Sequence, residues 1–427
     1  MIAVTVIFLL VLIALSVPIA AVLAWLALIL DHFYSFLPLQ RAITEIAWQT
    51  GNEFLLVAIP LFILMGEILL RSRIAERLYE ALSLWVSWLP GGVMHANIGS
   101  CAMFAATSGS SVATAATVGT AAMPEIDRRK YNEPLFLGTL AAGGTLGILI
   151  PPSINLIIYG LLTETSVPTL YIAALIPGIL LAGTFMAIIV GICVIRPAAG
   201  GTKVETNWAA RFRSLPALVP PVLLFAVVVG SIYAGWATPT EAASLGVIAS
   251  IVLAALNRTL TIDMVRKALE GTLRTSTMIM LIVTAAIFLN FVLAAVGLPG
   301  EIVGAIEALD WGPLGTLALI VAIYLVLGCF METLSMLIAT TPLIAPIVLS
   351  LGYDPVWFGV VLMILLEMAL ITPPIGVNLF VVQGVRGRGS INQVMVGSLP
   401  FLGAMLFMVV LLIALPDIAL WLPQLFE

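Results

Sequence analysis

One small, polar stretch decides the fold: Ala105-Ala-Thr-Ser-Gly-Ser-Ser-Val-Ala-Thr-Ala-Ala-Thr117, which lies between hydrophobic segments. A second unusual stretch follows, Gly143-Gly-Thr-Leu-Gly-Ile-Leu-Ile-Pro-Pro-Ser-Ile-Asn155. The same pair of features comes again as Phe330-Met-Glu-Thr-Leu-Ser335 and Leu370-Ile-Thr-Pro-Pro-Ile-Gly-Val-Asn378. Ser110 and Glu332 are 222 positions apart, and so are Pro151 and Pro373. Matched polar breaks indicate a duplicated unit, and in a membrane chain they point to the binding site of a transporter.

The composition places the chain in a bilayer. Of its 427 residues, 62% are hydrophobic and 9% are charged, whereas about a quarter of the residues of a soluble domain are charged. The sequence has no basic face, which excludes a nucleic-acid partner. The three cysteines and two histidines lack the spacing of a zinc site or a disulfide framework. There is no Walker or dinucleotide glycine motif, so we expect no use of ATP and coupling to an ion gradient.

Hydrophobic segments of about 20 residues predict the membrane crossings. Nine are expected, at residues 2–30, 54–70, 135–162, 171–195, 215–234, 242–256, 278–296, 356–385 and 394–420. The crossings 135–162 and 356–385 are broken at their Pro-Pro pairs. Residues 93–123 and 314–351 are apolar but interrupted in the middle, so we interpret them as re-entrant helical hairpins. The predicted fold is therefore all-α, polytopic, with two hairpins and two broken helices.

The basic residues test this topology. If the N-terminus is cytoplasmic, 16 of the 17 Lys and Arg residues fall in cytoplasmic segments, and only Arg41 falls outside. This agrees with the positive-inside rule. It predicts a multi-pass protein of the bacterial cytoplasmic membrane with a periplasmic C-terminus. The first hairpin then opens to the cytoplasm and the second to the exterior.

The two halves are expected to be inverted repeats, because their first helices run in opposite directions. We expect an N-terminal scaffold helix and outer loop at 1–50, and a first repeat at 51–197. A linker with two scaffold helices at 198–259 and a second repeat at 260–427 follow. Amphipathic arms lying in the interface are predicted at 74–88 and 299–311, and a further cytoplasmic helix at 260–273.

The hairpin tips and helix breaks are the candidate sites, because carbonyl oxygens and helix ends are free there. Carbonyl and hydroxyl oxygens suit Na⁺, and helix N-termini suit an anion. One predicted Na⁺ cage consists of Ser108, Ser110, Ser111, Gly144, Thr145, Gly147 and Pro151. The mirror cage consists of Glu332, Thr333, Thr372, Pro373 and Gly376. A small organic solute is expected between the tips, at Ser108, Gly109, Ser110, Ser153, Asn155, Thr333, Ser335 and Asn378.

The small residues and the Pro-Pro pairs also have ordinary structural explanations. Small residues also line tight helix contacts, and a Pro-Pro pair is also found at a mere kink, but four features at matched spacing favour a binding site. Glu332 and Glu367 lie within apolar runs, where ionisable residues usually have a function. Glu332 is expected near Na⁺ or at the aqueous mouth of its hairpin. For Glu367 a structural hydrogen-bonding role is favoured.

The sequence resembles the large membrane subunit, DctM-like, of the tripartite ATP-independent periplasmic (TRAP) transporters over nearly its whole length. The resemblance rests on motifs in a fixed order: Val17-Pro-Ile-Ala20, Ile59-Pro-Leu-Phe62 with Gly66, Ser108-Gly-Ser110, Met123-Pro124, Gly143 to Ile154, Thr238-Pro-Thr-Glu241 and Ile371-Thr-Pro-Pro-Ile-Gly-Val-Asn-Leu-Phe380. One departure is Glu332, where the family often has Asp, and it concerns only the detail of the second cage.

The resemblance implies a Na⁺-coupled secondary transporter with an elevator-type motion, similar to other ion transporters. It implies two partners, a small four-helix membrane subunit (DctQ-like), expected here as a separate polypeptide, and a periplasmic substrate-binding protein. Family solutes include C4-dicarboxylates, sialic acids, other organic acids and ectoines.

Two alternatives stay open at this point. A stand-alone Na⁺/organic-anion symporter would work without a binding protein. An intramembrane enzyme using Glu332 or Glu367 is disfavoured, because the sequence has no Gly-x-Ser-x-Gly or His-rich site and the duplication has no catalytic use.

Overall fold

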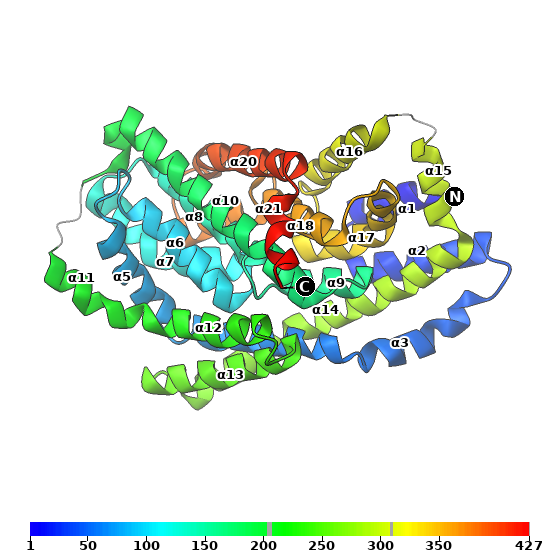
Figure 1. Ribbon diagram of the computed structural model, residues 1–427, viewed down its shortest axis with the longest axis horizontal. Coiled ribbons are helices and arrows are strands. Elements are labelled where there is room, and N and C mark those ends of the chain that lie inside the picture. The colour runs from blue at the N-terminus through cyan, green and yellow to red at the C-terminus, as the bar shows by residue number, and fades with distance from the viewer. Residues whose placement is uncertain (203–206, 308–310, 427) are drawn as a thin grey trace.

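The computed structural model describes residues 1–202, 207–307 and 311–426, and within these ranges every regular element is a helix (Figure 1). Five described helices are long and apolar enough to cross a membrane, or up to eight if each bent pair counts as one span. The predicted all-α, polytopic class is confirmed. Among the helices that belong neither to the hairpins nor to the broken helices are α2 (Ile19–Tyr34), α3 (Ile43–Gly51), α4 (Ala58–Leu70), α10 (Val167–Ile195), α11 (Trp208–Ser214), α12 (Val219–Tyr233) and α13 (Pro239–Leu256).

The first hairpin consists of α6 (Val93–Ser108) and α7 (Ser111–Arg129), which pack against each other. Gly109 ends α6 with a left-handed backbone, φ 60°, a conformation that costs glycine little. Ser110 then begins α7, because its side chain accepts a hydrogen bond from the N–H of Ala113. The helix ends therefore lie at the polar stretch that interrupts this apolar region.

The second hairpin consists of α16 (Gly312–Leu327) and α17 (Thr333–Ser350). Glu332 caps α17, since its carboxylate accepts hydrogen bonds from the N–H of Ser335 at 3.1 Å and from the hydroxyl of Thr333 at 3.0 Å. A carboxylate at a helix N-terminus is favourable because of the helix dipole. Glu332 thus caps the second helix of its hairpin, as Ser110 does in the first hairpin.

Both predicted broken helices are broken at their Pro-Pro pairs. The first consists of α8 (Glu133–Leu149) and α9 (Ile154–Thr163), which meet at an angle of 42°. The second consists of α18 (Pro355–Ile371) and α19 (Val377–Arg386). Proline lacks a backbone N–H and clashes with the preceding turn, so two consecutive prolines end each first half-helix.

The broken helices exchange partners at their breaks. Before the breaks, α8 packs against α7 and α18 packs against α17. After the breaks, α9 packs against α17 and α19 packs against α7. Each second half-helix therefore lies against the hairpin of the other half of the chain. Each hairpin therefore contacts the broken helices of both halves.

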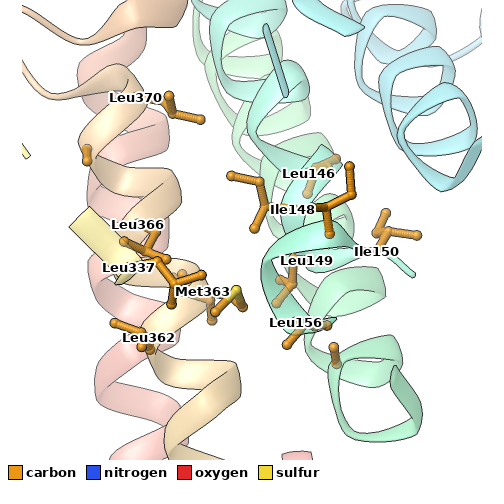
Figure 2. Packing of buried hydrophobic residues seen from close by; sticks show 14 of the residues in the cluster. Leu146, Ile148, Leu149, Ile150, Leu156, Leu337, Leu362, Met363, Leu366 and Leu370 are labelled. Carbon is orange, nitrogen blue, oxygen red and sulfur yellow. The ribbon is translucent and has the colours of Figure 1, made fainter. Parts of the chain in front are cut away.

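An apolar layer joins α8 and α18 at the level of the breaks (Figure 2). The side chains that Figure 2 labels in this layer are wholly or largely buried: Leu146, Ile148, Leu149, Ile150, Leu156, Leu337, Leu362, Met363, Leu366 and Leu370. Close packing of such side chains resists relative movement. The two broken helices therefore form one body with the two hairpins.

Two of the helix predictions were wrong in their boundaries. The helix predicted at 260–273 and the crossing predicted at 278–296 are one 35-residue helix, α14 (Ile262–Val296), because no proline or turn signal lies between them. The crossing predicted at 394–420 ends with α20 (Ile391–Ala414), and a short α21 (Asp417–Gln424) follows Pro416. The arms are close to prediction, as α5 (Ile74–Val86) and α15 (Leu298–Glu307), although 308–310 lie outside the described residues.

The single crossing predicted over 2–30 was also wrong. This segment forms two packed helices, α1 (Ile2–Ala14) and α2, which meet at a turn containing Ser16 with φ 57° and Pro18. The turn lines one cavity together with Met278 and Ile282, which lie near the start of the apolar part of α14. The amino group of Met1, in contrast, lies 3.5 Å from the carboxylate of Glu301 on α15, which follows the end of α14 (Figure 1). The segment therefore folds back, and both its ends lie at the same end of α14.

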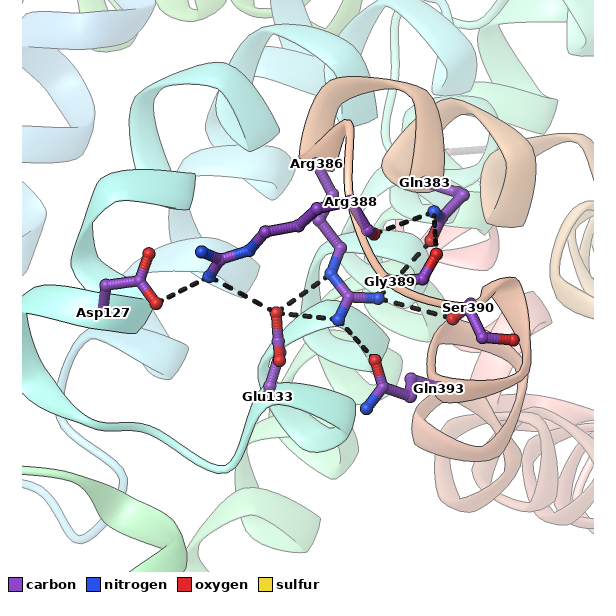
Figure 3. A network of polar contacts seen from close by, with 8 residues as sticks. All are labelled: Asp127, Glu133, Gln383, Arg386, Arg388, Gly389, Ser390 and Gln393. Atoms are coloured by element: carbon purple, nitrogen blue, oxygen red, sulfur yellow. Dashed lines mark hydrogen bonds and ion pairs between the residues drawn. The ribbon is translucent and has the colours of Figure 1, made fainter.

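A polar network fastens the two halves at one end of the molecule (Figure 3). Arg386, whose side chain is 3% exposed, pairs with Glu133 at 2.8 Å. Arg388, which is exposed, pairs with Asp127 at 2.6 Å and lies 3.6 Å from Glu133. The hydrogen bond from Arg388 lowers the pKa of Asp127 below its usual range. The network links the end of α7 and the start of α8 to the end of α19 and the loop that follows it.

We predict that Arg386→Ala lowers the melting temperature of the purified protein by about 5 °C, because it leaves Glu133 partly buried without its main partner. Arg388→Ala is the matched control and should cost about 1 °C or less, since an exposed pair contributes little. The measurement is a thermal unfolding curve in detergent. Equal effects of the two variants would contradict the assignment of Arg386 as the central member of the network.

Candidate functional site

The first hairpin tip lies directly on the first broken helix. A methyl group added at Gly147 of α8 would lie 3.0 Å from the backbone nitrogen of Ser111. One added at Gly109 would lie 3.4 Å from the carbonyl oxygen of Pro152. Glycine is thus used where two backbones approach closely. The structure brings the predicted residues Gly109, Ser110, Ser111 and Gly147 together.

Gly144 of α8 is also in close contact with the first hairpin, as Gly147 is. A methyl group there would lie 3.2 Å from the carbonyl oxygen of Ser111 and 3.0 Å from Nδ2 of Asn378. Ser111 Oγ is buried and has no hydrogen-bond partner among the described residues. A buried polar atom without a partner is costly. The set of hydroxyl and carbonyl oxygens is the kind that suits a hard cation.

For three other residues predicted in the first site, no contact between the hairpin tip and the broken helix is described. The hydroxyl of Thr145 donates its proton to the carbonyl of Ala142 at 2.7 Å, and the lone pairs of its oxygen stay available. Pro151 is buried within the break. The side chain of Ser108 lies outside the described residues, although its backbone ends α6.

The second tip meets the second break through other residues than the sequence suggested. The Sγ of Cys329 lies 3.5 Å from the carbonyl oxygen of Pro373, and a methyl group at Gly328 would lie 2.5 Å from the Cβ of Ala369. The hydroxyl of Thr372 donates to the carbonyl of Met368 at 2.6 Å, and Gly376 is buried in the break. Glu332 and Thr333 face a cavity that Thr372, Pro373 and Gly376 do not line.

That cavity, of about 140 Å³, joins the two hairpin tips. It can hold several water molecules. Gly109, Ser110 and Ser111 line it from the first tip, and Glu332 and Thr333 from the second. Asn155, which follows the first break, also lines it and is 4% exposed. Residues 222 positions apart in the sequence therefore face one space.

Three other residues predicted to bind the solute do not line this cavity. Ser153 is buried and begins α9, since its hydroxyl accepts from the N–H of Leu156. Ser335 faces a second, mostly apolar cavity of about 510 Å³ between the second tip, α14 and the turn at Ser16. Asn378, predicted at the second break, lies instead beside Gly144 in the first site.

The cavity has a second wall that sequence reasoning missed. Ile63 and Glu67 of α4 line it, together with Thr275 and Ile279 of α14. Glu67 forms an ion pair with Arg71. A methyl group at Gly271 of α14 would lie 2.7 Å from the Glu67 carboxyl group. Glu67 lies in an apolar run, which in the sequence is a signal for a functional residue. The residues of α14 that line the same cavity have no such signal in the sequence.

Glu367 of α18 links the two broken helices. It is completely buried, and its Oε1 accepts hydrogen bonds from the N–H groups of Ile148 at 3.1 Å and Leu149 at 2.9 Å. These two groups belong to the last turn of α8, directly before the first break. The geometry agrees with the structural role favoured from the sequence. A side chain of the second half of the chain thus hydrogen-bonds to the backbone next to the break in the first half.

The fold and the cavity define a class of protein. Interrupted helices and hairpins that meet at a polar cavity inside a membrane chain are typical of secondary transporters. The model of the family described as "Tripartite ATP-independent periplasmic transporter, DctM component" matches residues 6–418. The chain belongs to this family.

Individual relatives agree. The chain is 32% identical over 386 residues to a C4-dicarboxylate TRAP transporter large permease protein of Pseudomonas aeruginosa, covering 90% of each chain. It is 31% identical to a sialic acid TRAP transporter large permease protein of Vibrio cholerae, covering 87% of this chain and 86% of the relative. The permease family excludes the intramembrane enzyme.

A likeness among solved structures concerns the fold alone. The crystal structure of the Alcanivorax borkumensis YdaH transporter matches with a TM-score of 0.55 and 15% identity, over 88% of each chain.

We predict that Gly147→Ala reduces solute uptake at least tenfold, because the new methyl group separates the first tip from the first broken helix. Gly183→Ala is the matched control, since nothing lies within 4 Å of a methyl group at this position of α10. Uptake by reconstituted protein measures both. An unimpaired Gly147→Ala variant would show that the close contact at Gly147 is not needed.

Proposed function

We propose that this chain is the Na⁺-coupled, solute-translocating subunit of a TRAP transporter. The observation that carries the proposal is the single cavity shared by both hairpin tips, Asn155 and the helices α4 and α14. Ser111 and Gly144 supply oxygen ligands for Na⁺ beside it. The solute binds in the cavity itself.

The proposed motion is of the elevator type. The hairpins and broken helices form the moving body, because they exchange partners and share the layer around Glu367. The helices α4 and α14 form the track. Thr275 and Leu70 line the cavity, and each is next in sequence to an arginine, Arg274 and Arg71. If basic residues mark the cytoplasm, the structure is the inward-facing state.

The proposed orientation modifies the prediction for the N-terminus. Because α1 and α2 fold back, the segment 1–34 does not change sides, so both termini lie on the periplasmic face of the bacterial cytoplasmic membrane. The segment 1–30 contains no Lys or Arg, and the distribution of basic residues is therefore unaltered. We therefore propose a periplasmic N-terminus in place of the cytoplasmic one expected from the sequence.

Family membership supports two partners, a small membrane subunit and a periplasmic binding protein that delivers the solute. We propose a small organic acid or similar polar solute, because relatives are named for C4-dicarboxylate and for sialic acid. No Lys or Arg lines the described cavity, so a solute carboxylate is held by hydroxyls, amides and bound Na⁺.

The test is uptake into proteoliposomes that contain this chain and its small subunit, with a panel of C4-dicarboxylates, sialic acid and ectoine. We predict that uptake requires both an inward Na⁺ gradient and the binding protein. Uptake that needs Na⁺ but not the binding protein would indicate a stand-alone symporter. Uptake that is indifferent to Na⁺ would overturn the proposed coupling.

A further inference from the structure

Asn378 lies in an unexpected place. It belongs to α19, which follows the second break, yet its Nδ2 donates a hydrogen bond to the carbonyl of Ala141 on α8 at 3.2 Å. It is completely buried, and it approaches Gly144 more closely than an added methyl group would tolerate without movement. The second broken helix therefore reaches into the ion site of the first half.

The orientation of the Asn378 amide is determined by its contact. A carbonyl oxygen accepts and never donates, so the NH₂ group must be the end that faces Ala141. The Oδ1 atom is consequently at the opposite end, and it has no hydrogen-bond partner in the described part of the chain. Ser111 Oγ is another buried oxygen without a partner among the described residues. Both oxygens belong to residues that approach Gly144: a methyl group added there would lie 3.0 Å from Asn378 Nδ2 and 3.2 Å from the carbonyl oxygen of Ser111. Two buried oxygens without partners, on residues that meet at one glycine, suit a cation.

Asn155 is the corresponding residue of the other broken helix, and its free group is the opposite one. Its Nδ2 is buried without a partner among the described residues, while the side chain lines the cavity between the tips. A free donor suits an oxygen of the solute and does not suit a cation. The two asparagines therefore have different chemical partners.

We infer that Asn378 supplies a Na⁺ ligand to the first ion site from the second half of the chain, whereas Asn155 donates to the solute. This inference rests on the proposed function and deepens it. A ligand from the other half makes ion binding fix α19 against α8 and α7. The first ion therefore orders the body that also carries the second hairpin, and Na⁺ binding should promote solute binding.

The experiment measures uptake by the complete transporter in proteoliposomes as a function of Na⁺ and of solute. We expect Asn378→Ala to raise the Na⁺ concentration for half-maximal uptake about tenfold, with the solute KM changed less at saturating Na⁺. Asn155→Ala is the matched control and should do the reverse. Asn378→Asp keeps a ligand oxygen, so its Na⁺ dependence should lie closer to wild type than that of Asn378→Ala.

The possible outcomes separate the two levels of the account. If wild-type uptake does not depend on Na⁺, the proposed function fails. If wild-type uptake depends on Na⁺ and Asn378→Ala leaves that dependence unchanged, the inference about Asn378 alone is overturned. If Asn378→Asp is no better than Asn378→Ala while both keep the wild-type melting temperature, the oxygen has no role in ion binding and the inference is again overturned.

Discussion

The structure depends on the satisfaction of backbone groups at breaks inside the membrane. Lipid offers no hydrogen bonds, so an interrupted helix is stable there only when protein or a water-filled cavity supplies partners. Glu367 supplies them at the first break, through the N–H groups of Ile148 and Leu149. Ser110 and Glu332 supply them at the tips. The same interruptions leave oxygens that can bind an ion, so stability and function have a common origin.

The hairpins and the broken helices of the two halves pack together because each second half-helix lies against the hairpin of the other half. Since α9 packs on the second hairpin and α19 on the first, an ion or solute bound at one tip contacts segments of both halves. The pair Arg386–Glu133 fastens the same halves at one end. In the proposed mechanism, these contacts would transmit binding at either tip to the other without a separate coupling element.

The sequence revealed the breaks because Pro-Pro pairs, glycines and buried acids are local signals. It did not reveal that Asn378 belongs with Gly144, or that Glu67 and Thr275 face the tips, because such contacts arise only from packing between distant segments. The fold of residues 1–34 was missed for another reason. The charge rule cannot orient a segment whose first 30 residues contain no basic residue, and the break at Ser16–Pro18 is short.

The central claim is that the first tip, the first broken helix and Asn378 together bind Na⁺. The most direct measurement is a pair of cryo-electron microscopy maps of the assembled transporter, in Na⁺ and in choline, at a resolution that shows ions and waters. The account predicts a density present only in Na⁺, in contact with Ser111, the backbone next to Gly144 and Oδ1 of Asn378. Identical maps at this position, from protein whose uptake depends on Na⁺, would contradict it.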